Sequence, residues 1–101
     1  MLKHVPVRPL IAGIAWFDRK QWQRLTEAVE NRSELDDTYE IWQQSALDAV
    51  QMIERQGQVV EKVHVEVESL VYWCKEKGLP VNGKSRSDYV TQLARRRHGQ
   101  A

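Results

Sequence analysis

A strongly specified helix stop divides the C-terminal third of this chain into two amphipathic segments. Before the stop, apolar residues recur at helical spacing, at Val67, Leu70, Val71 and Cys74. Gly78 then suits the left-handed position that follows a helix, and Pro80 cannot continue one. The sequence therefore predicts a helix from about residue 66 that ends at Gly78.

A second helix is expected to restart near Ser85, whose hydroxyl can cap it together with Asp88 three residues later. Its buried side would be formed by Tyr89, Val90, Leu93 and Ala94. Residues 66–98 are thus expected to form a helix-turn-helix-like unit. Basic side chains would surround the free N–H groups at the start of its second helix.

Two strands are expected in the preceding part of the chain. Residues 10–16 are apolar on both faces, which is typical of a central, covered strand, and Gly13 indicates that another backbone approaches closely. Residues 59–65 alternate, with Val59, Glu61, Val63 and Val65 on one side and Val60, Lys62 and His64 on the other. This pattern predicts a half-exposed strand.

Two helices are expected between these strands. Asp18 and Gln21 form a capping-box pattern, with Phe17 and Trp22 at the positions of a hydrophobic staple, and this helix should end near Asn31. The other should begin at Ser33, with Asp36 three residues later, and continue for about 22 residues until Gly57, or ~33 Å. Because that is long for so small a domain, part of it is expected to pack against a second copy.

The predicted fold is a single α+β domain over residues 1–101, in the order β-α-α-β-α-α. It would comprise an extended arm (1–9), a β-α-α-β unit (10–65) and the C-terminal unit (66–98), with a narrow two- or three-stranded sheet covered by helices. The sequence leaves parallel and antiparallel pairing open. So narrow a sheet favours completion across a homodimer.

Composition excludes several classes of protein. The single cysteine, Cys74, cannot form an intramolecular disulfide, and the N-terminal apolar segments are too short for a membrane span, so we expect a cytoplasmic protein without membrane contact. The net charge of +1 is unevenly distributed. Residues 18–57 carry nine acidic and five basic side chains, whereas residues 66–101 carry four acidic and seven basic ones.

The sequence offers little for catalysis. Its three histidines, His4, His64 and His98, lack zinc-site spacing. The carboxylates Asp36, Asp37 and Glu40 are expected to stabilise a helix N-terminus rather than to hold a metal. We therefore expect no catalytic residue, metal or cofactor. The expected function is that of a non-enzymatic, self-associating binding or accessory module.

The segment Gly78-Leu79-Pro80, with Gly83, Arg86, Tyr89 and Leu93, resembles the SAP-type helix, extended loop, helix motif over about a third of the chain. The match needs one extra residue between Gly83 and Arg86. The resemblance implies DNA binding as an alternative function. Candidate nucleic-acid-binding residues are Lys84, Ser85, Arg86, Arg95, Arg96 and Arg97. Taken whole, the chain resembles small bacterial proteins of unknown function.

Two other interpretations of the same segment remain open. The first is structural: a Gly-Leu-Pro segment followed by Gly is common where a helix ends and the chain turns, and the basic residues around it would then simply be solvated. In addition, residues 78–85 match the P-loop pattern G-x-x-x-x-G-K-[ST], with Lys84 and Ser85 in the phosphate and magnesium positions. A P-loop must follow a buried strand, whereas the residues before Gly78 are expected to be helical. Nucleotide binding is thus a remote alternative.

Overall fold

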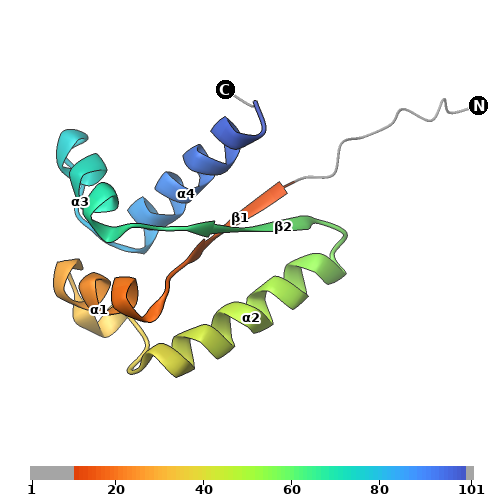
Figure 1. Ribbon diagram of the computed structural model, residues 1–101, viewed down its shortest axis with the longest axis horizontal. Coiled ribbons are helices and arrows are strands. Elements are labelled where there is room, and N and C mark those ends of the chain that lie inside the picture. The colour runs from red at the N-terminus through yellow and green to blue at the C-terminus, as the bar shows by residue number, and fades with distance from the viewer. Residues whose placement is uncertain (1–10, 100–101) are drawn as a thin grey trace, which may run out of the picture.

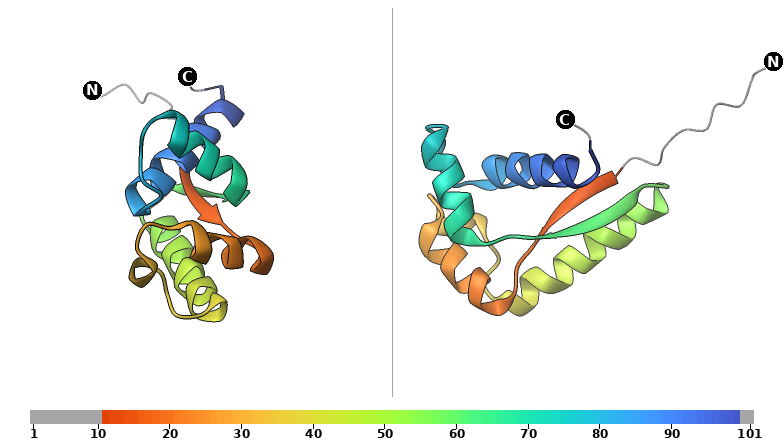
Figure 2. Two further views of the ribbon diagram at one scale, coloured as in Figure 1. Left: turned by 90° about the vertical axis from the view of Figure 1, so that its left-hand side faces the viewer. Right: turned by 45° about the horizontal axis from the view of Figure 1, so that its top comes forward.

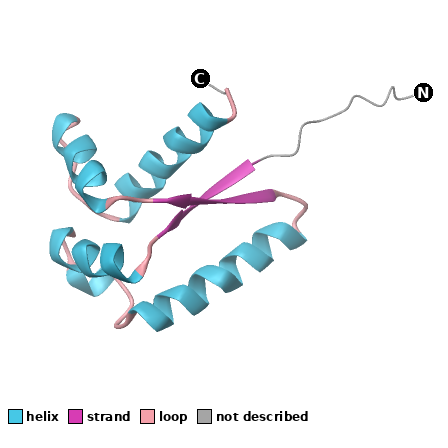
Figure 3. Cartoon of the chain, in the orientation of Figure 1, coloured by secondary structure: helices cyan, strands magenta, loops and turns pink. Residues whose placement is uncertain are grey.

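The computed structural model describes residues 11–99, in which helices enclose a single pair of strands (Figures 1 and 3). The elements are β1 (Ile11–Trp16), α1 (Arg19–Ala28), the 3₁₀ helix η1 (Arg32–Glu34), α2 (Tyr39–Arg55), β2 (Val59–His64), α3 (Val67–Glu76) and α4 (Gly83–Arg97). The α+β class and the order β-α-α-β-α-α are therefore confirmed. The predicted arm of residues 1–9 lies outside the described range.

The helices form two layers around the strands. Helices α1 and α2 lie on one side, and α3 and α4 lie on the other (Figures 1 and 2). α2 packs mainly against β2, whereas α4 packs mainly against β1. α1 and α3 contact each other beyond the carboxyl ends of the strands. None of the helices within residues 11–99 has the length and apolar character needed to span a bilayer.

The two strands pair in parallel, with Ile11 opposite Val59 and Trp16 opposite His64. This decides the direction that the sequence left open, and the chain returns through α1 and α2 because parallel strands need a long crossover. The expectation that β1 is a central, covered strand is wrong. Within residues 11–99 the sheet has only two strands, and every residue of β1 is partly exposed.

Gly13 allows α4 to approach β1 closely. A Cβ atom built on Gly13 would lie 3.2 Å from both Val90 Cγ1 and Ala94 Cβ, and 3.5 Å from Val63 Cγ2. The expected close approach therefore comes from the side chains of a helix and not from a neighbouring backbone. Val63 is fully buried beneath the same helix, which agrees with the alternation predicted for β2.

The start of α1 differs in one respect from the predicted capping box. Asp18 Oδ1 accepts a hydrogen bond from the backbone N–H of Gln21 at 2.7 Å, as expected. The side chain of Gln21 does not complete the box; its Oε1 accepts from the backbone N–H of Val67 at 2.7 Å and so ties α1 to the start of α3. The staple is confirmed, since the rings of Phe17 and Trp22 pack with centroids 6.5 Å apart. α1 ends at Ala28, before the position that the sequence favoured.

The predicted start of the long helix at Ser33 is wrong. Asn31 caps the short helix η1, and Thr38 caps α2 by accepting from the N–H of Ile41 at 3.1 Å. Between these caps the Arg32 guanidinium donates to three backbone carbonyls, those of Leu35, Asp36 and Asp37. These bonds stabilise a non-helical loop, so α2 has 17 residues.

Aromatic side chains fill the space between α2, α1 and the end of β1. Trp42 contacts four other rings, with centroids 5.3 to 5.6 Å away, namely Trp16, Phe17, Trp22 and Tyr39. The remaining core lies between the strands, α3 and α4, and includes Val63, Val65, Leu70, Cys74 and Val90. Cys74 is a buried free thiol, as its position on the apolar stripe predicted.

Replacing Gly13 by Val should lower the free energy of unfolding by about 1–3 kcal/mol, because the new side chain would overpack the contact with Val90 and Ala94. Gly83→Ala is the matched control. A Cβ at Gly83 meets only Arg86 Nη2, at 3.7 Å, so this change should be neutral or stabilising. Urea unfolding measures both. Equal effects of the two substitutions would contradict this account of α4 packing.

Candidate nucleic-acid interface

The helix stop predicted after α3 is confirmed. Gly78 has a φ of +66°, which is the left-handed region that favours glycine. The N–H of Leu79 donates to the carbonyl of Cys74 at 2.8 Å, and the N–H of Gly78 donates to that of Lys75 at 3.2 Å. This pair of bonds is the Schellman motif. It turns the chain sharply and brings α4 back alongside α3.

The start of α4 lies earlier than the sequence predicted. Asn82, not Ser85, is the N-cap: its side-chain oxygen accepts from the N–H of Ser85 at 3.0 Å, and the Ser85 hydroxyl accepts from the N–H of Asn82 at 3.0 Å. Ser85 is almost fully buried, and its hydroxyl also donates to the carbonyl of Pro80 at 2.7 Å. Its oxygen is therefore engaged in holding the turn and is not directed at solvent.

The segment that matches the P-loop pattern has a different setting from a phosphate loop. It follows helix α3 instead of a strand, as the sequence favoured. Ser85 is engaged in the turn, and Lys84 Nζ lies 3.0 Å from a carboxylate oxygen of Asp88. The geometry of residues 78–85 therefore does not favour nucleotide binding.

Carboxylates pair with two of the candidate basic residues. Lys84 pairs with Asp88, four residues later on the same helix, and both side chains are exposed. Arg97 Nη1 lies 2.8 Å from Glu61 Oε2 on β2, and the ring of His98 bonds the other oxygen of the same carboxylate. Hydrogen bonds from His98 and then from Arg97 lower the pKa of Glu61. Arg97 thus joins the end of α4 to the sheet.

Arg86 belongs to α4, and its partly buried side chain lies near Glu34 in the segment between α1 and α2. Its Nη1 atom is inaccessible to solvent and has no hydrogen-bond partner among the described residues. Burial lowers the pKa of this guanidinium, and the nearby charge of Glu34 opposes that effect. Arg86 is consequently a poor choice for contacting an external phosphate, because moving it outward would disturb this corner.

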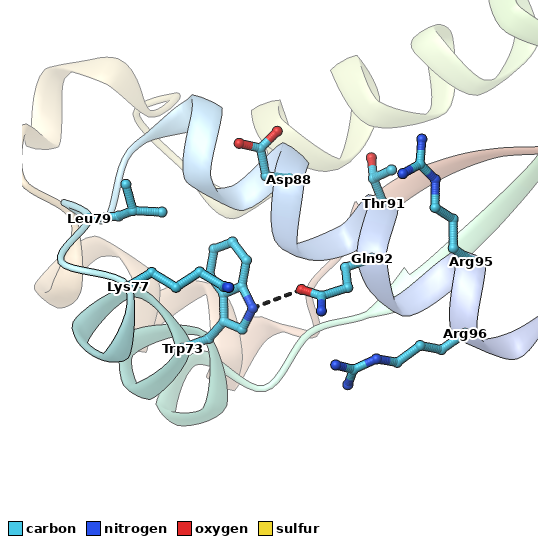
Figure 4. A pocket seen from close by; sticks show the side chains of 8 residues that line it. All are labelled: Trp73, Lys77, Leu79, Asp88, Thr91, Gln92, Arg95 and Arg96. Carbon is cyan, nitrogen blue, oxygen red and sulfur yellow. Dashed lines mark hydrogen bonds between the residues drawn. The ribbon is translucent and has the colours of Figure 1, made fainter. Parts of the chain in front are cut away.

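The remaining candidates, Arg95 and Arg96, are exposed and form no ion pair within residues 11–99. They border a groove of about 710 Å³ between α3 and α4 (Figure 4). The groove is lined by Trp73, Lys77, Leu79, Asp88, Thr91, Gln92, Arg95 and Arg96. The structure thus keeps two of the six predicted residues together and separates them from Lys84, Ser85, Arg86 and Arg97.

The floor of this groove is an ordered polar and aromatic contact between the two helices. The indole Nε1 of Trp73 donates to Gln92 Oε1 at 2.8 Å, and the ring of Trp73 packs against Tyr89 with centroids 5.3 Å apart. Lys77 Nζ lies over the Trp73 ring, 5.3 Å from its centroid (Figure 4). This cation–π contact holds the ammonium group at the groove.

Sequence reasoning missed Lys77, Trp73 and Gln92 as members of this site. The available signal was the position of Trp73 at the margin of the apolar stripe of α3, where a side chain faces a neighbouring helix. Gln92, on the other helix, offers an oxygen to the indole N–H, which usually finds a partner when it is buried. No local pattern pairs them, because they are 19 residues apart.

The groove has an excess of positive charge. Lys77, Arg95 and Arg96 form no ion pair in the described part of the chain, whereas its one carboxylate, that of Asp88, is bound to Lys84. Because Arg95 and Arg96 also lie in the last turn of α4, they interact favourably with the helix dipole. The arrangement can bind an anion without rearranging an existing ion pair.

Comparisons with protein-family models, with curated proteins and with solved structures find no match to this chain. The described side chains include no group of three or more His, Cys, Asp or Glu residues placed to hold a metal ion. The geometry of the groove is therefore the basis for any functional inference.

Replacing Arg86 by Glu should destabilise the fold by about 1–3 kcal/mol, because it places a carboxylate in a partly buried position beside Glu34. Arg86→Met, which keeps an apolar stem without the charge, should cost much less. Thermal and urea unfolding compare the two variants. An Arg86→Glu protein as stable as the wild type would show that this side chain is free to leave the corner.

The bonds to Glu61 should make stability depend on pH. Because its pKa is lowered in the folded state, Glu61 contributes stability that is present above its unfolded pKa of about 4.3 and is lost as the pH falls through the folded value. The wild type should therefore exceed Glu61→Gln in unfolding free energy at pH 5 to 6, and the difference should shrink at lower pH. Glu27→Gln, at an exposed position without an ion pair in the described structure, is the control. A difference that does not change between about pH 5 and pH 2 would contradict this role.

Proposed function

We propose that this chain is a non-enzymatic binding module that holds the phosphate backbone of DNA in the groove between α3 and α4. The observation that carries the proposal is the position of Lys77, Arg95 and Arg96, three cationic groups without carboxylate partners around one groove. DNA binding also agrees with the cytoplasmic location expected from the sequence. The proposal moves the contact surface from the start of α4 to its second half.

Phosphate is the anion that these side chains suit best. Arginine presents a planar fork of donors that matches two phosphate oxygens, and lysine supplies a compact point charge. Arg95 and Arg96 are consecutive on α4, so their side chains diverge and can contact separate phosphates (Figure 4). Lys77 approaches from α3 on the other side of the groove. A chain of phosphates is favoured over a single one by this spacing of charge along the surface.

A duplex is favoured over a single strand. Proteins that bind single strands without sequence preference usually offer aromatic rings on which bases stack. Here Lys77 lies over the Trp73 ring, and the indole N–H is bonded to Gln92. The ring is therefore occupied by contacts within the protein. Backbone contacts of this kind position a protein on DNA without reading its sequence.

The double variant Arg95→Glu with Arg96→Glu should weaken binding to a duplex at least about tenfold near 50 mM salt, because two phosphate contacts become repulsive. A plot of the logarithm of the wild-type association constant against the logarithm of the salt concentration should have a slope of about −3. For the variant the slope should be about −1, because two phosphate contacts are lost. Fluorescence anisotropy of a labelled duplex gives both quantities.

The charge-matched control is Lys20→Glu with Arg55→Glu. Both residues are exposed, lie on α1 and α2, and form no ion pair within residues 11–99. This control should keep the affinity within about threefold, since it changes net charge equally but leaves the groove intact. Wild-type protein that ignores duplex DNA at low salt, or a control that loses binding as fully as the groove variant, would overturn the proposal.

A further inference from the structure

The side-chain amide of Gln92 has one orientation, which its partner on α3 determines. The indole N–H of Trp73 can only donate, so the atom of Gln92 that lies 2.8 Å from it is the carbonyl oxygen Oε1. The amide nitrogen Nε2 is then on the other side of the amide, and Figure 4 shows it directed away from the indole. Without such a partner, the amide could present either atom to a ligand.

The ring of Trp73 is held in place by two further contacts. The rings of Trp73 and Tyr89 meet in an edge contact with an interplanar angle of 62°. Lys77 Nζ lies over the face of the indole, 5.3 Å from its centroid. Because turning the indole away from Gln92 would break both contacts, the orientation of the amide is set before any ligand arrives.

The amide nitrogen of Gln92 is available to a ligand. Within residues 11–99, Gln92 makes its side-chain hydrogen bond through Oε1, and none is formed by Nε2. The described side chains leave only Arg86 Nη1 both buried and unpaired, so Nε2 is within reach of solvent. Since Gln92 lines the groove between α3 and α4, its nitrogen offers two N–H groups there.

The charges along α4 favour the end of the groove that this nitrogen faces. Asp88, Gln92 and Arg96 all line the groove and follow one another at intervals of four residues, so each lies about one turn beyond the last. An anion is repelled at the Asp88 end and attracted at the Arg96 end. Figure 4 shows the amide nitrogen of Gln92 on the same side as the Arg96 guanidinium.

We propose that Gln92 is a neutral phosphate ligand of this groove, whose amide nitrogen donates to an oxygen of the phosphate that Arg96 binds. Amide side chains, like those of Arg and Lys, donate to phosphate oxygens in protein–DNA complexes. Trp73 is the positioning residue, because its N–H keeps the carbonyl oxygen of Gln92 turned away from the phosphate. The inference rests on the proposed DNA binding and adds a contact of a different kind.

The contact differs from those of the cationic residues in its response to salt. The salt dependence of DNA binding arises from counterions that are released when cationic side chains neutralise phosphates. An uncharged donor neutralises no phosphate, so the hydrogen bond from Gln92 should be equally strong at low and high salt. The contacts of Lys77, Arg95 and Arg96 weaken as salt is added, and Gln92 then supplies a growing share of the affinity.

Gln92→Met tests this role, because it keeps the length of the side chain and removes the donor. Anisotropy of a labelled duplex over a salt series should show an association constant at least about fivefold below that of the wild type at every salt concentration, with the slope still about −3. Arg96→Met should instead change the slope to about −2. Gln51→Met, at an exposed position on α2, is the matched control and should stay within about twofold of the wild type.

Trp73→Phe separates a phosphate contact from a purely structural role. It breaks the same hydrogen bond but leaves the donor of Gln92 in place, free to choose between two orientations. This should lower affinity only about twofold, since about half of the molecules present the nitrogen. If Gln92 served only as the acceptor for the indole, Trp73→Phe and Gln92→Met would have equal effects, and this result would overturn the inference.

An NMR titration of the wild type with the same duplex provides a test that does not require any variant to fold. The side-chain amide signals of Gln92 should shift together with the indole N–H of Trp73. Binding of the wild type with the expected slope, but with these amide signals unmoved or with affinity unchanged in Gln92→Met, would overturn the role of Gln92 alone. A wild type that does not bind the duplex would overturn both this inference and the proposed function.

Discussion

The contact between Gly13 and α4 sets the position of everything that the C-terminal half of this chain presents. Because Gly13 has no side chain, Val90 and Ala94 rest directly on β1, and this fixes which face of α4 is buried. With that face buried, the side chains of Arg95 and Arg96 lie on the exposed side of α4, where they line the groove beside α3. A larger residue at this one position of the strand would displace the helix that forms half of the groove.

Pairing within the chain decides which positive charges are available to a ligand. Seven basic residues fall within residues 66–101, yet Lys84 is bound to Asp88, Arg97 is bound to Glu61, and Arg86 is partly buried beside Glu34. Of the four basic residues left over, Lys77, Arg95 and Arg96 line the groove between α3 and α4, and Lys75 does not. The fold thus divides the basic residues of this region into those that are bound within the protein and those that are accessible to a ligand.

The parts of this fold that local chemistry specifies could be predicted from the sequence. Gly78 and Pro80 identified the stop after α3, Phe17 and Trp22 identified the staple of α1, and the alternation in β2 identified its buried side. These features depend on residues a few positions apart, so a single sequence contains the information.

Features that depend on distant contacts could not be predicted. Where several residues that can cap a helix lie close together, additional hydrogen bonds decide which of them is the N-cap. The Ser85 hydroxyl donates to the Pro80 carbonyl in the turn, and Asn82 is the residue that caps α4. In the same way Arg32 binds the loop carbonyls that keep α2 from starting early. The groove arises from the packing of α3 on α4, through Trp73 and Gln92, and no short-range pattern encodes it.

The most direct test of the central claim is an NMR titration of the ¹⁵N-labelled chain with a short duplex at low salt. If the groove between α3 and α4 holds the phosphate backbone, the largest shifts should fall on Lys77, Arg95, Arg96 and the indole N–H of Trp73, and they should reverse as salt is added. Shifts concentrated around Gly83 and Lys84 at the start of α4, or no shifts at any duplex concentration, would contradict the account.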